Sequence, residues 1–389
     1  MKKLLEIQNL KTNFYTYEGV VKALDGINLD IKEGETLGVV GETGCGKSVT
    51  ALSILRLILP PGKVEEGKVL FWGKRKLSVD DGGVDLLSKK EVFLRGVRGN
   101  EISMIFQEPG TSLNPVYSIG DQISESFLLH QQKELCRAAI KEIEKNIRES
   151  NFFLKIFIYH LQKKIYKKML ENSKSLGIKF FSILPLVNRY KIWLKKKAMK
   201  RVVDLLTKLG VPDPQRIIER YPHELSGGMQ QRVVIAIALA CNPRLLIADE
   251  PTSNLDVTIQ AQILDLIRRL KEKLGLSILF ITHDLGVVAE LCDRVAIMYA
   301  GNICEIAEVK ELFKKPLHPY TKALMNSVPT WEGKDLESIK GNVPNLVNPP
   351  GGCRFHPRCN YALEICSQEK PEIQEVENNH WVACHNYLR

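Results

Sequence analysis

A glycine-rich segment near the start of the chain has the spacing of a phosphate-binding loop. Residues 41–48 read G-E-T-G-C-G-K-S, after the apolar run 37–40 and before a segment, 48–59, that we expect to be helical. Glycines let backbone N–H groups point at phosphate oxygens, and a helix N-terminus adds positive potential. Lys47 should then reach the β- and γ-phosphates of a nucleotide, and Ser48 should hold Mg²⁺. The predicted nucleotide contacts here are Gly41, Thr43, Gly44, Cys45, Gly46, Lys47, Ser48 and Val49.

Two adjacent carboxylates end another apolar run, 245–248, and a histidine follows them. Asp249 is expected to hold Mg²⁺ and to contact the nucleotide, while Glu250 is placed to polarise an attacking water. Alone, such a pair is typical of a solvated strand end, but the upstream loop favours nucleotide hydrolysis. His283 ends the apolar run 277–282 and could sense the γ-phosphate through Nε2. Glu250 and His283 are the predicted catalytic residues.

A second candidate phosphate site lies shortly before the acidic pair. Residues 225–232 read L-S-G-G-M-Q-Q-R and open a predicted helix, 230–240. Ser226 and the amides of Gly227 and Gly228 would again offer donors at a helix N-terminus. A single nucleotide does not need two such sites within one chain. We therefore expect two chains packed head to tail, each giving this segment to the other's nucleotide.

Together these segments resemble the ABC (ATP-binding cassette) ATPase family, over about 1–130 and 200–325. The resemblance implies an α/β P-loop NTPase fold with a helical subdomain at about 108–240, and it implies ATP and Mg²⁺ as ligands. It identifies Gln107 with the family's Q-loop glutamine, a nucleotide and Mg²⁺ contact, and 253–256 (S-N-L-D) with its D-loop, with Asn254 where alanine is commoner. Further implied nucleotide contacts are Gln230, Asp256 and Phe14, the last stacking on adenine with Tyr15 and Tyr17 as rivals.

These groups must be positioned by strands and by the segments around them. Short apolar runs predict strands at 37–40, 102–106, 245–248 and 277–282, and two further strands, 295–299 and 303–307, flank a turn. The predicted cassette spans 1–325. A Pro-, Gly-, Asn- and Cys-rich region, 326–389, should form a small C-terminal domain.

A basic insertion interrupts the expected helical subdomain. Residues 131–201 hold 19 Lys and Arg against 5 Glu and no Asp, so their net charge of +14 exceeds the +10 of the whole chain. Ile140, Ile143 and Ile147 recur with helical spacing. Relatives are shorter here, so about 134–198 is an insertion. We hypothesise that 163–168 and 191–201 contact anionic lipid headgroups; the alternative is a solvated helical pair without a partner.

The C-terminal segments 316–321, 343–346 and 352–359 resemble the extension of oligopeptide and dipeptide importer ATPases, which nickel importers share in large part. This resemblance implies two membrane permease subunits, a sister ATPase, an extracellular peptide-binding protein, and a peripheral place on the cytoplasmic face of the cell membrane. No run of 18 or more apolar residues occurs, which agrees with separate membrane subunits.

Four cysteines crowd the end of the chain: Cys353, Cys359, Cys366 and Cys384. Thiolates in a core-poor tail suggest a metal staple, whereas disulfides do not suit a cytoplasmic protein. The wide spacing suits an Fe–S cluster better than zinc, which usually uses close C-x2-4-C pairs. Zinc and unligated thiols remain alternatives. The resemblance adds that some dipeptide-importer ATPases carry a 4Fe–4S cluster in this tail.

The sequence thus predicts an ATPase that drives import of di- or oligopeptides. A nickel importer ATPase of the same clan is one alternative. Another is an ABC-type DNA-maintenance ATPase, which also carries basic helical insertions. Those insertions are much longer and show sustained heptads, whereas this one contains Pro185 and no clean heptad. We therefore expect no nucleic-acid partner.

Overall fold

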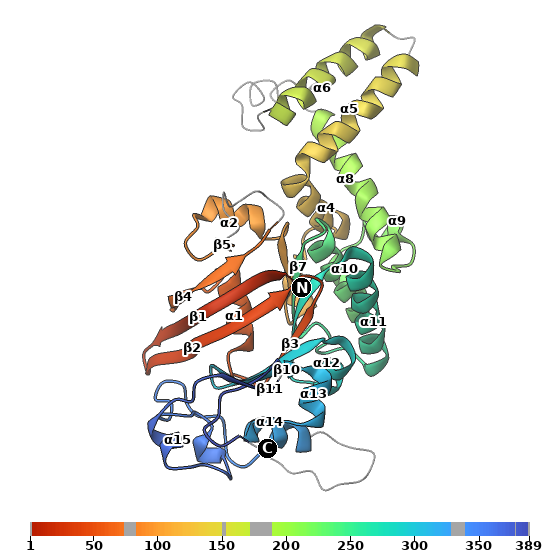
Figure 1. Cartoon of the computed structure of the whole chain (residues 1–389). Coiled ribbons are helices and arrows are strands. Elements are labelled where there is room, and N and C mark those ends of the chain that lie inside the picture. Colours follow the sequence, from red (N-terminus) through yellow and green to blue (C-terminus); the bar gives the residue numbers. More distant parts are fainter. Residues whose placement is uncertain are drawn as a thin grey trace. The chain divides into compact units, whose positions relative to one another are not determined.

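The computed structural model describes residues 2–73, 83–149, 153–171, 189–327, 339–377 and 379–387. The chain forms two compact units, which can be followed along the sequence in Figure 1. Unit 1 comprises 1–107, 244–253 and 260–389, and unit 2 comprises 108–243 and 254–259. In the sequence, the two segments of the helical unit 2 therefore alternate with the three segments of unit 1.

A largely parallel sheet forms the centre of unit 1. Its eight strands lie in the order β11-β12-β10-β9-β3-β8-β7-β6, and the pairs β9-β3, β3-β8, β8-β7 and β7-β6 are parallel. Strands β3, β7, β8 and β9 are buried at every position, which explains why they read as continuous apolar runs. The predicted strands are confirmed as β3 (Thr36–Val40), β6 (Ile102–Ile105), β7 (Leu245–Asp249), β8 (Ser277–Thr282), β9 (Arg294–Tyr299) and β10 (Asn302–Glu308).

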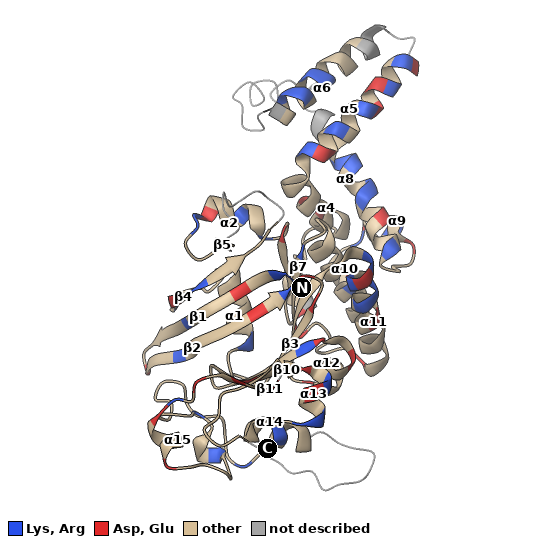
Figure 2. Ribbon diagram, viewed as in Figure 1, with Lys and Arg blue, Asp and Glu red and all other residues tan. Residues whose placement is uncertain are grey.

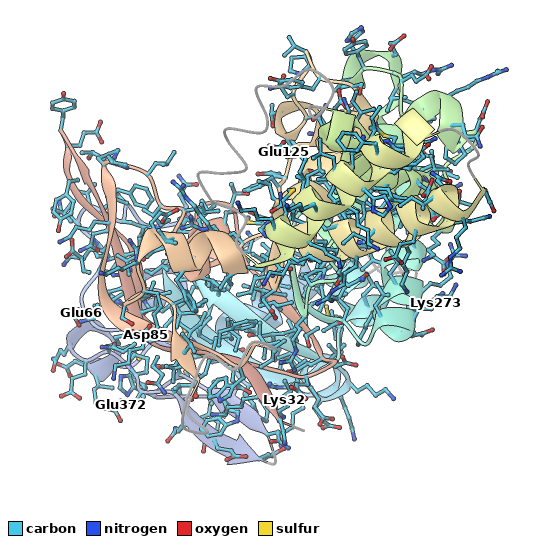
Figure 3. All side chains as sticks on the ribbon, turned by 90° about the horizontal axis from the view of Figure 1, so that it is seen from above. Lys32, Glu66, Asp85, Glu125, Lys273 and Glu372 are labelled. Atoms are coloured by element: carbon cyan, nitrogen blue, oxygen red, sulfur yellow. The ribbon has the colours of Figure 1, made fainter. Side chains whose placement is uncertain are left out.

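An antiparallel sheet of four strands, ordered β2-β1-β4-β5, completes the strand content of unit 1. One apolar core joins this sheet to the parallel one, because Leu5 and Ile31 belong to the same buried cluster as Val39 and Ile281. Figure 3 labels Lys32, Glu66 and Asp85 on three of these strands. The strands are β1 (Lys3–Thr16), β2 (Gly19–Lys32), β4 (Gly62–Phe71) and β5 (Val84–Asp85), and helix α2 (Glu91–Val97) follows them.

The two helices next to the glycine-rich segments differ slightly from the sequence-based expectation. Helix α1 covers Lys47–Ile54 rather than extending to 59. The chain turns after it because Arg56 adopts a left-handed φ of 52° and prolines follow at 60 and 61. Helix α10 covers Gly227–Leu239, so it begins directly after Ser226 and includes both glycines of that segment.

Unit 2 consists of helices. In Figure 1, α5 and α6 form a helical hairpin, and α8 packs against α4 and α5 in the same bundle. Leu135, Ala139 and Ile143 form the buried face of α5, which confirms helical structure for the described part of the insertion. The elements are α3 (Pro109–Ser112), α4 (Ile119–His130), α5 (Gln132–Glu149), α6 (Phe153–Glu171), α8 (Arg189–Lys208), α9 (Pro214–Ile217) and α10; α11 (Val257–Leu274) begins here and continues in unit 1.

Parts of the insertion, 150–152 and 172–188 with Pro185, lie outside the described residues. Among the helices that are described, none combines the length and the apolar character needed to cross a membrane.

Acidic side chains pair with several of the insertion's basic groups. Lys163 Nζ lies 2.7 Å from Glu144 Oε1, and Lys195 Nζ lies 2.7 Å from Asp121 Oδ1. Lys197 also pairs with Glu142, and Arg201 with Glu134. Figure 2 shows acidic positions among the basic ones on the ribbon of α5, whereas the coloured positions along α6 are basic. The predicted positive surplus is therefore partly neutralised within unit 2.

The C-terminal region continues the main sheet. Strand β12 (His380–Val382) pairs with β10, and β11 (Gln374–Glu377) pairs with β12. Glu305 on β10 is fully buried and accepts hydrogen bonds from the backbone N–H of Leu317 and His318, and it bonds to His380 Nε2 at 2.7 Å. This carboxylate joins β10, the start of α14 (Pro319–Asn326) and β12. Of the expected domain 326–389, residues 328–338, 378, 388 and 389 lie outside the described part.

Candidate functional site

The predicted phosphate loop lies between β3 and α1, at the carboxyl end of a central strand. Gly44 and Gly46 adopt left-handed φ values of 80° and 108°, which only glycine takes without strain. Gly41 is packed so closely that an added Cβ would lie 2.0 Å from the carbonyl oxygen of Met298. The glycines at these spacings are therefore required by the path of the backbone.

Lys47 starts α1 and its ammonium group lies against the loop. Its Nζ donates to the carbonyl oxygens of Gly41 at 2.7 Å and Glu42 at 3.1 Å, and the side chain is buried. A phosphate entering the loop would find this amine already held at its rim. Loop residues Gly41, Cys45 and Gly46 are buried as well, whereas Thr43 and Gly44 are exposed.

Asp249 lies next to this loop, at the end of β7. Burial raises the pKa of Asp249, a hydrogen bond from the Ser48 hydroxyl opposes that rise, and the charge of Glu250 adds to it. Its Oδ1 is buried and has no hydrogen-bond partner among the described residues. A buried carboxylate oxygen beside a serine hydroxyl suits Mg²⁺, which prefers hard oxygen ligands. Ser48 and Asp249, two of the three residues predicted from sequence to hold Mg²⁺, are thus neighbours.

Glu250 is held between two predicted site residues. Its Oε2 accepts a hydrogen bond from Gln107 Nε2 at 3.0 Å, and its Oε1 lies 3.2 Å from His283 Nδ1. The Glu250 backbone has a φ of 46°. This left-handed turn at the strand end is sparsely populated for non-glycine residues and is typical of functional positions. Because Nδ1 of His283 faces Glu250, Nε2 is the ring nitrogen that remains for a phosphate.

The second predicted phosphate site belongs to unit 2. Ser226 occupies the N-cap position of α10 but makes no capping hydrogen bond through its side chain. An added Cβ on Gly228 would lie 2.8 Å from Ile259, so the start of α10 and the start of α11 are closely packed within this unit. The hydroxyl of Ser226 and the first N–H groups of a 13-residue helix form an arrangement suited to an anion.

Three other predicted nucleotide contacts make local interactions in this structure. The Gln230 amide donates to the carbonyl oxygens of Pro222 and Leu225 at 2.9 and 3.3 Å. Asp256 accepts from the Ile259 N–H at 3.0 Å, as a cap of α11 does. Phe14 packs beside Gly62 on the antiparallel sheet. Their roles at the nucleotide stay predictions.

The aromatic rivals of Phe14 differ in their surroundings. The Tyr15 hydroxyl donates to Glu65 at 2.6 Å, whereas Tyr17 is fully exposed. Neither observation assigns the adenine contact.

The four C-terminal cysteines gather in one loop-rich part of unit 1. The Cys353 N–H donates to the Cys366 carbonyl at 2.8 Å. Burial, together with the proximity of the other three thiols, raises the pKa of Cys384 to about 12. Backbone N–H groups lie 3.4 Å from three of the sulfurs: Tyr361 N to Cys359, Leu363 N to Cys366, and Asn386 N to Cys384.

No ready-made site for a metal ion accompanies this gathering. In the part of the chain that the structure describes, no three His, Cys, Asp or Glu side chains are grouped so that they could hold such an ion.

Two family models match the chain. The model described as "ABC transporter" matches residues 24–253, which is more than half of the chain. The chain belongs to the ABC transporter family. The model described as "Oligopeptide/dipeptide transporter, C-terminal region" matches residues 304–366. The α/β cassette with this C-terminal region agrees with the fold predicted from sequence.

Relatives of this ABC chain match along nearly their whole length. The dipeptide transport ATP-binding protein DppD of Bacillus subtilis is 41% identical over 388 residues, covering 99% of this chain and 95% of the relative. The oligopeptide transport ATP-binding protein OppD of the same organism is 42% identical, covering 98% and 88%. The probable peptide ABC transporter ATP-binding protein y4tR of Sinorhizobium fredii is 43% identical, covering 98% and 94%.

Solved ABC cassettes share the fold. The ATP-binding cassette MJ0796, solved as a dimer with ADP and phosphate, aligns with a TM-score of 0.53 and 22% identity, covering 79% of this chain and 99% of its own. The cassette cbiO1 of Clostridium perfringens aligns with a TM-score of 0.52 and 25% identity, covering 81% and 92%.

Sequence reasoning missed contacts between the C-terminal region and the phosphate loop of the ABC cassette. The Glu42 N–H donates to the Tyr320 hydroxyl at 3.0 Å, and the Glu42 carboxylate binds Arg358. Tyr320 and Arg358 lie in two of the three C-terminal segments, 316–321 and 352–359, that the sequence singled out by resemblance alone. That resemblance was the only available signal, and it gave no reason to connect them to residue 42.

Replacing Glu250 with Gln should trap the ABC cassette with ATP bound. The amide keeps the size of the side chain but cannot act as a base, so we expect ATP hydrolysis to fall at least about 10²-fold while ATP binding persists. Size-exclusion chromatography with ATP should then show an ATP-dependent dimer. Glu311→Gln, an exposed carboxylate on α13 (Val309–Lys314), is the matched control and should behave like the wild type. Hydrolysis by the Glu250 variant at the wild-type rate contradicts the assignment.

Proposed function

We propose that this chain is the ATP-hydrolysing subunit of a peptide importer. One observation carries the ATPase part: at the carboxyl edge of the parallel sheet, Glu250 is held by Gln107 and His283, and Asp249 beside it adjoins Ser48 of the phosphate loop. The peptide part is supported by the match of residues 304–366 and by relatives named for dipeptide and oligopeptide transport. These favour peptides over nickel and over DNA maintenance.

The loop and the strand ends have separate tasks in binding ATP. The loop amides and Lys47 would bind the phosphates, with Lys47 exchanging the Gly41 and Glu42 carbonyl oxygens for phosphate oxygens. Ser48 and Asp249, with Gln107, would hold Mg²⁺, which when bound neutralises charge on the β- and γ-phosphates. The unpartnered Oδ1 of Asp249 is the observation that supports this ligand set.

Hydrolysis requires that a water molecule be deprotonated opposite the leaving ADP. Glu250 would accept the proton of the attacking water, and the amide of Gln107 and the imidazole of His283 hold this carboxylate in one orientation. His283 would use Nε2 on the γ-phosphate. Holding the base in advance lowers the barrier, because little reorganisation is left to the reaction itself.

Coupling to transport would depend on a second cassette. Ser226, Gly227 and Gly228 at the start of α10 would bind the ATP of the partner chain, so ATP would join two cassettes head to tail and hydrolysis would release them. We propose a sister ATPase as that partner, together with two membrane permease subunits and an extracellular peptide-binding protein. The chain would act as a peripheral subunit on the cytoplasmic face of the membrane.

We further propose that Cys353, Cys359, Cys366 and Cys384 hold a 4Fe–4S cluster. Three of the sulfurs already lie beside backbone N–H groups, which stabilise thiolates bound to iron. A zinc ion needs its four ligands close to a single point, and the described residues offer no such grouping. A cluster spreads its ligands over four irons. When bound, it would cross-link the tail and could carry one electron.

The insertion is proposed to contact anionic lipid through the outer face of α6. Phe157 is 62% exposed, and Lys164 and Lys168 follow it seven and eleven residues later, on the same helix face. Lys164 and Lys168 form no ion pair within the described residues, unlike Lys163. An exposed aromatic ring with unpaired lysines on the same helix face is typical of membrane-surface helices.

Uptake by whole cells tests the transport function. With the cognate membrane subunits present, Lys47→Ala should abolish uptake of labelled di- and oligopeptides, because the phosphates lose their lysine, whereas uptake of labelled nickel should not change. Purification of the complex from membranes should recover the permeases and the sister ATPase. Peptide uptake that persists in the variant contradicts the proposal, and a selective loss of nickel uptake supports the alternative metal substrate.

Iron and sulfide analysis of anaerobically purified protein tests the cluster. We expect a brown protein with about four irons per chain, and loss of iron in Cys384→Ser. Cys136→Ser, a buried thiol of unit 2, is the control and should keep its iron. A colourless wild-type protein with one equivalent of zinc rules the cluster out.

Vesicle sedimentation tests the lipid contact. The wild-type protein should bind vesicles containing phosphatidylglycerol and release them as salt rises. Lys164→Glu with Lys168→Glu should weaken binding at least roughly 30-fold, since each lost lysine contributes about 1 kcal/mol at an anionic surface and each new carboxylate is repelled by it. Lys273→Glu with Lys314→Glu, two exposed lysines of unit 1, changes the net charge equally and is the control. Equal binding of the two double variants contradicts this proposal.

A further inference from the structure

Glu42, the second residue of the phosphate loop, is held by the C-terminal region at both its backbone and its side chain. Its N–H donates to the hydroxyl of Tyr320 on α14. Its carboxylate accepts from Arg358, with Nη1 3.0 Å from Oε1 and 3.1 Å from Oε2. All three residues belong to unit 1. The loop that is expected to bind phosphate therefore has one end fixed by residues about 280 and 316 positions later.

Arg358 is held by the tail, and within the described residues Glu42 is the acidic side chain with which it pairs. Its side chain is 7% exposed. Arg358 Nε donates to the Lys340 carbonyl oxygen at 2.9 Å, and Nη2 donates to the Ile339 carbonyl oxygen at 3.4 Å. Nη1 also donates to the Tyr299 hydroxyl at 3.1 Å. The remaining partners are neutral, so Glu42 is the carboxylate that pairs with this guanidinium.

Tyr320 is fixed in the same way. It is fully buried, and its ring packs against Tyr299 at 4.6 Å and Phe355 at 5.2 Å between ring centroids. Phe355 also contacts Tyr299, at 5.1 Å. These aromatic rings form a rigid support between the tail and the sheet, and they bring Arg358 and Tyr320 to the loop together.

The charge of Glu42 matters because of where it lies. A carboxylate on a loop that receives a triphosphate repels it unless a cation compensates, and the side chain is only partly exposed, so water screens it incompletely. Lys47 is bound to the Gly41 and Glu42 carbonyl oxygens and is the group expected on the phosphates. The compensating cation for Glu42 is Arg358.

We propose that Arg358 is a positioning residue of the ATP site: it neutralises Glu42 and holds the phosphate loop, so the C-terminal region sets the affinity for ATP. This inference rests on the proposed function, because it assumes that the loop binds ATP. Neither Arg358 nor Tyr320 touches the reacting atoms, so both act through the loop. The effect should therefore appear in binding of ATP rather than in the chemical step.

Binding of radiolabelled ATP to the full chain, with hydrolysis measured alongside, tests the proposal. Arg358→Gln leaves Glu42 without its cation, so we expect ATP binding to weaken about tenfold, KM to rise by the same factor and kcat to stay within about twofold. Adding Glu42→Gln to this variant removes the uncompensated charge and should restore binding to within about twofold of wild type. A purely structural role for Arg358 predicts no such rescue.

Further variants keep the result interpretable. Arg358→Lys retains the positive charge and should bind ATP nearly as wild type does, even if Arg358→Gln folds poorly. Lys315→Gln breaks an exposed ion pair with Glu377 in the same region and should have no effect. Lys47→Ala tests the proposed site itself. If it abolishes binding while Arg358→Gln does not change it, the inference is wrong and the proposed function stands; if neither variant weakens binding, both fail. Failure of Glu42→Gln to rescue Arg358→Gln also overturns the inference.

Discussion

The parallel order of the central strands is the constraint on which the rest of the site depends. Strands β3, β8 and β7 are neighbours and run in the same direction, so their carboxyl ends meet at one edge of the sheet. The phosphate loop follows β3, His283 follows β8, and the acidic pair begins at the last residue of β7. Residues up to about 240 positions apart in sequence are therefore adjacent without any special local structure. Gln107, just after β6, completes the set on the same edge.

The sequence was informative wherever backbone burial or backbone chemistry leaves a pattern. Buried parallel strands require unbroken apolar runs, so β3, β7 and β8 could be located closely. Gly44 and Gly46 mark left-handed positions that other residues avoid. The positive charge of the insertion can also be counted from the sequence, but its ion pairs cannot be predicted from it. The Lys163–Glu144 pair, for example, joins two helices whose relative register depends on packing. The same holds for Asp256, whose cap to Ile259 no spacing rule distinguishes from a nucleotide contact.

The C-terminal region makes a contact that its composition does not indicate. Its cysteines and turn-forming residues predict a small domain, and its described part also continues the main sheet through β12. Buried Glu305 makes this attachment strong, because three donors from two segments, the start of α14 and strand β12, converge on one carboxylate. Loss of any of these donors would leave a buried polar group unsatisfied. Neither hydropathy nor residue spacing reveals such a contact, since each donor is ordinary in its own segment.

The residues that attach the tail to the cassette therefore also hold the phosphate loop of the nucleotide site. Arg358 immediately precedes Cys359, so the short helix that delivers the guanidinium to Glu42 also delivers a thiol to the cysteine group. A ligand that ordered those thiols would also restrict the conformations of Arg358. Arg358 would then lose less conformational entropy when it pairs with Glu42. Conversely, an ordered loop holds the tail. In this importer ATPase the contacts that attach the tail and the contacts that hold the phosphate loop therefore share the same residues, Tyr320 and Arg358, without involving the residues proposed to carry out hydrolysis.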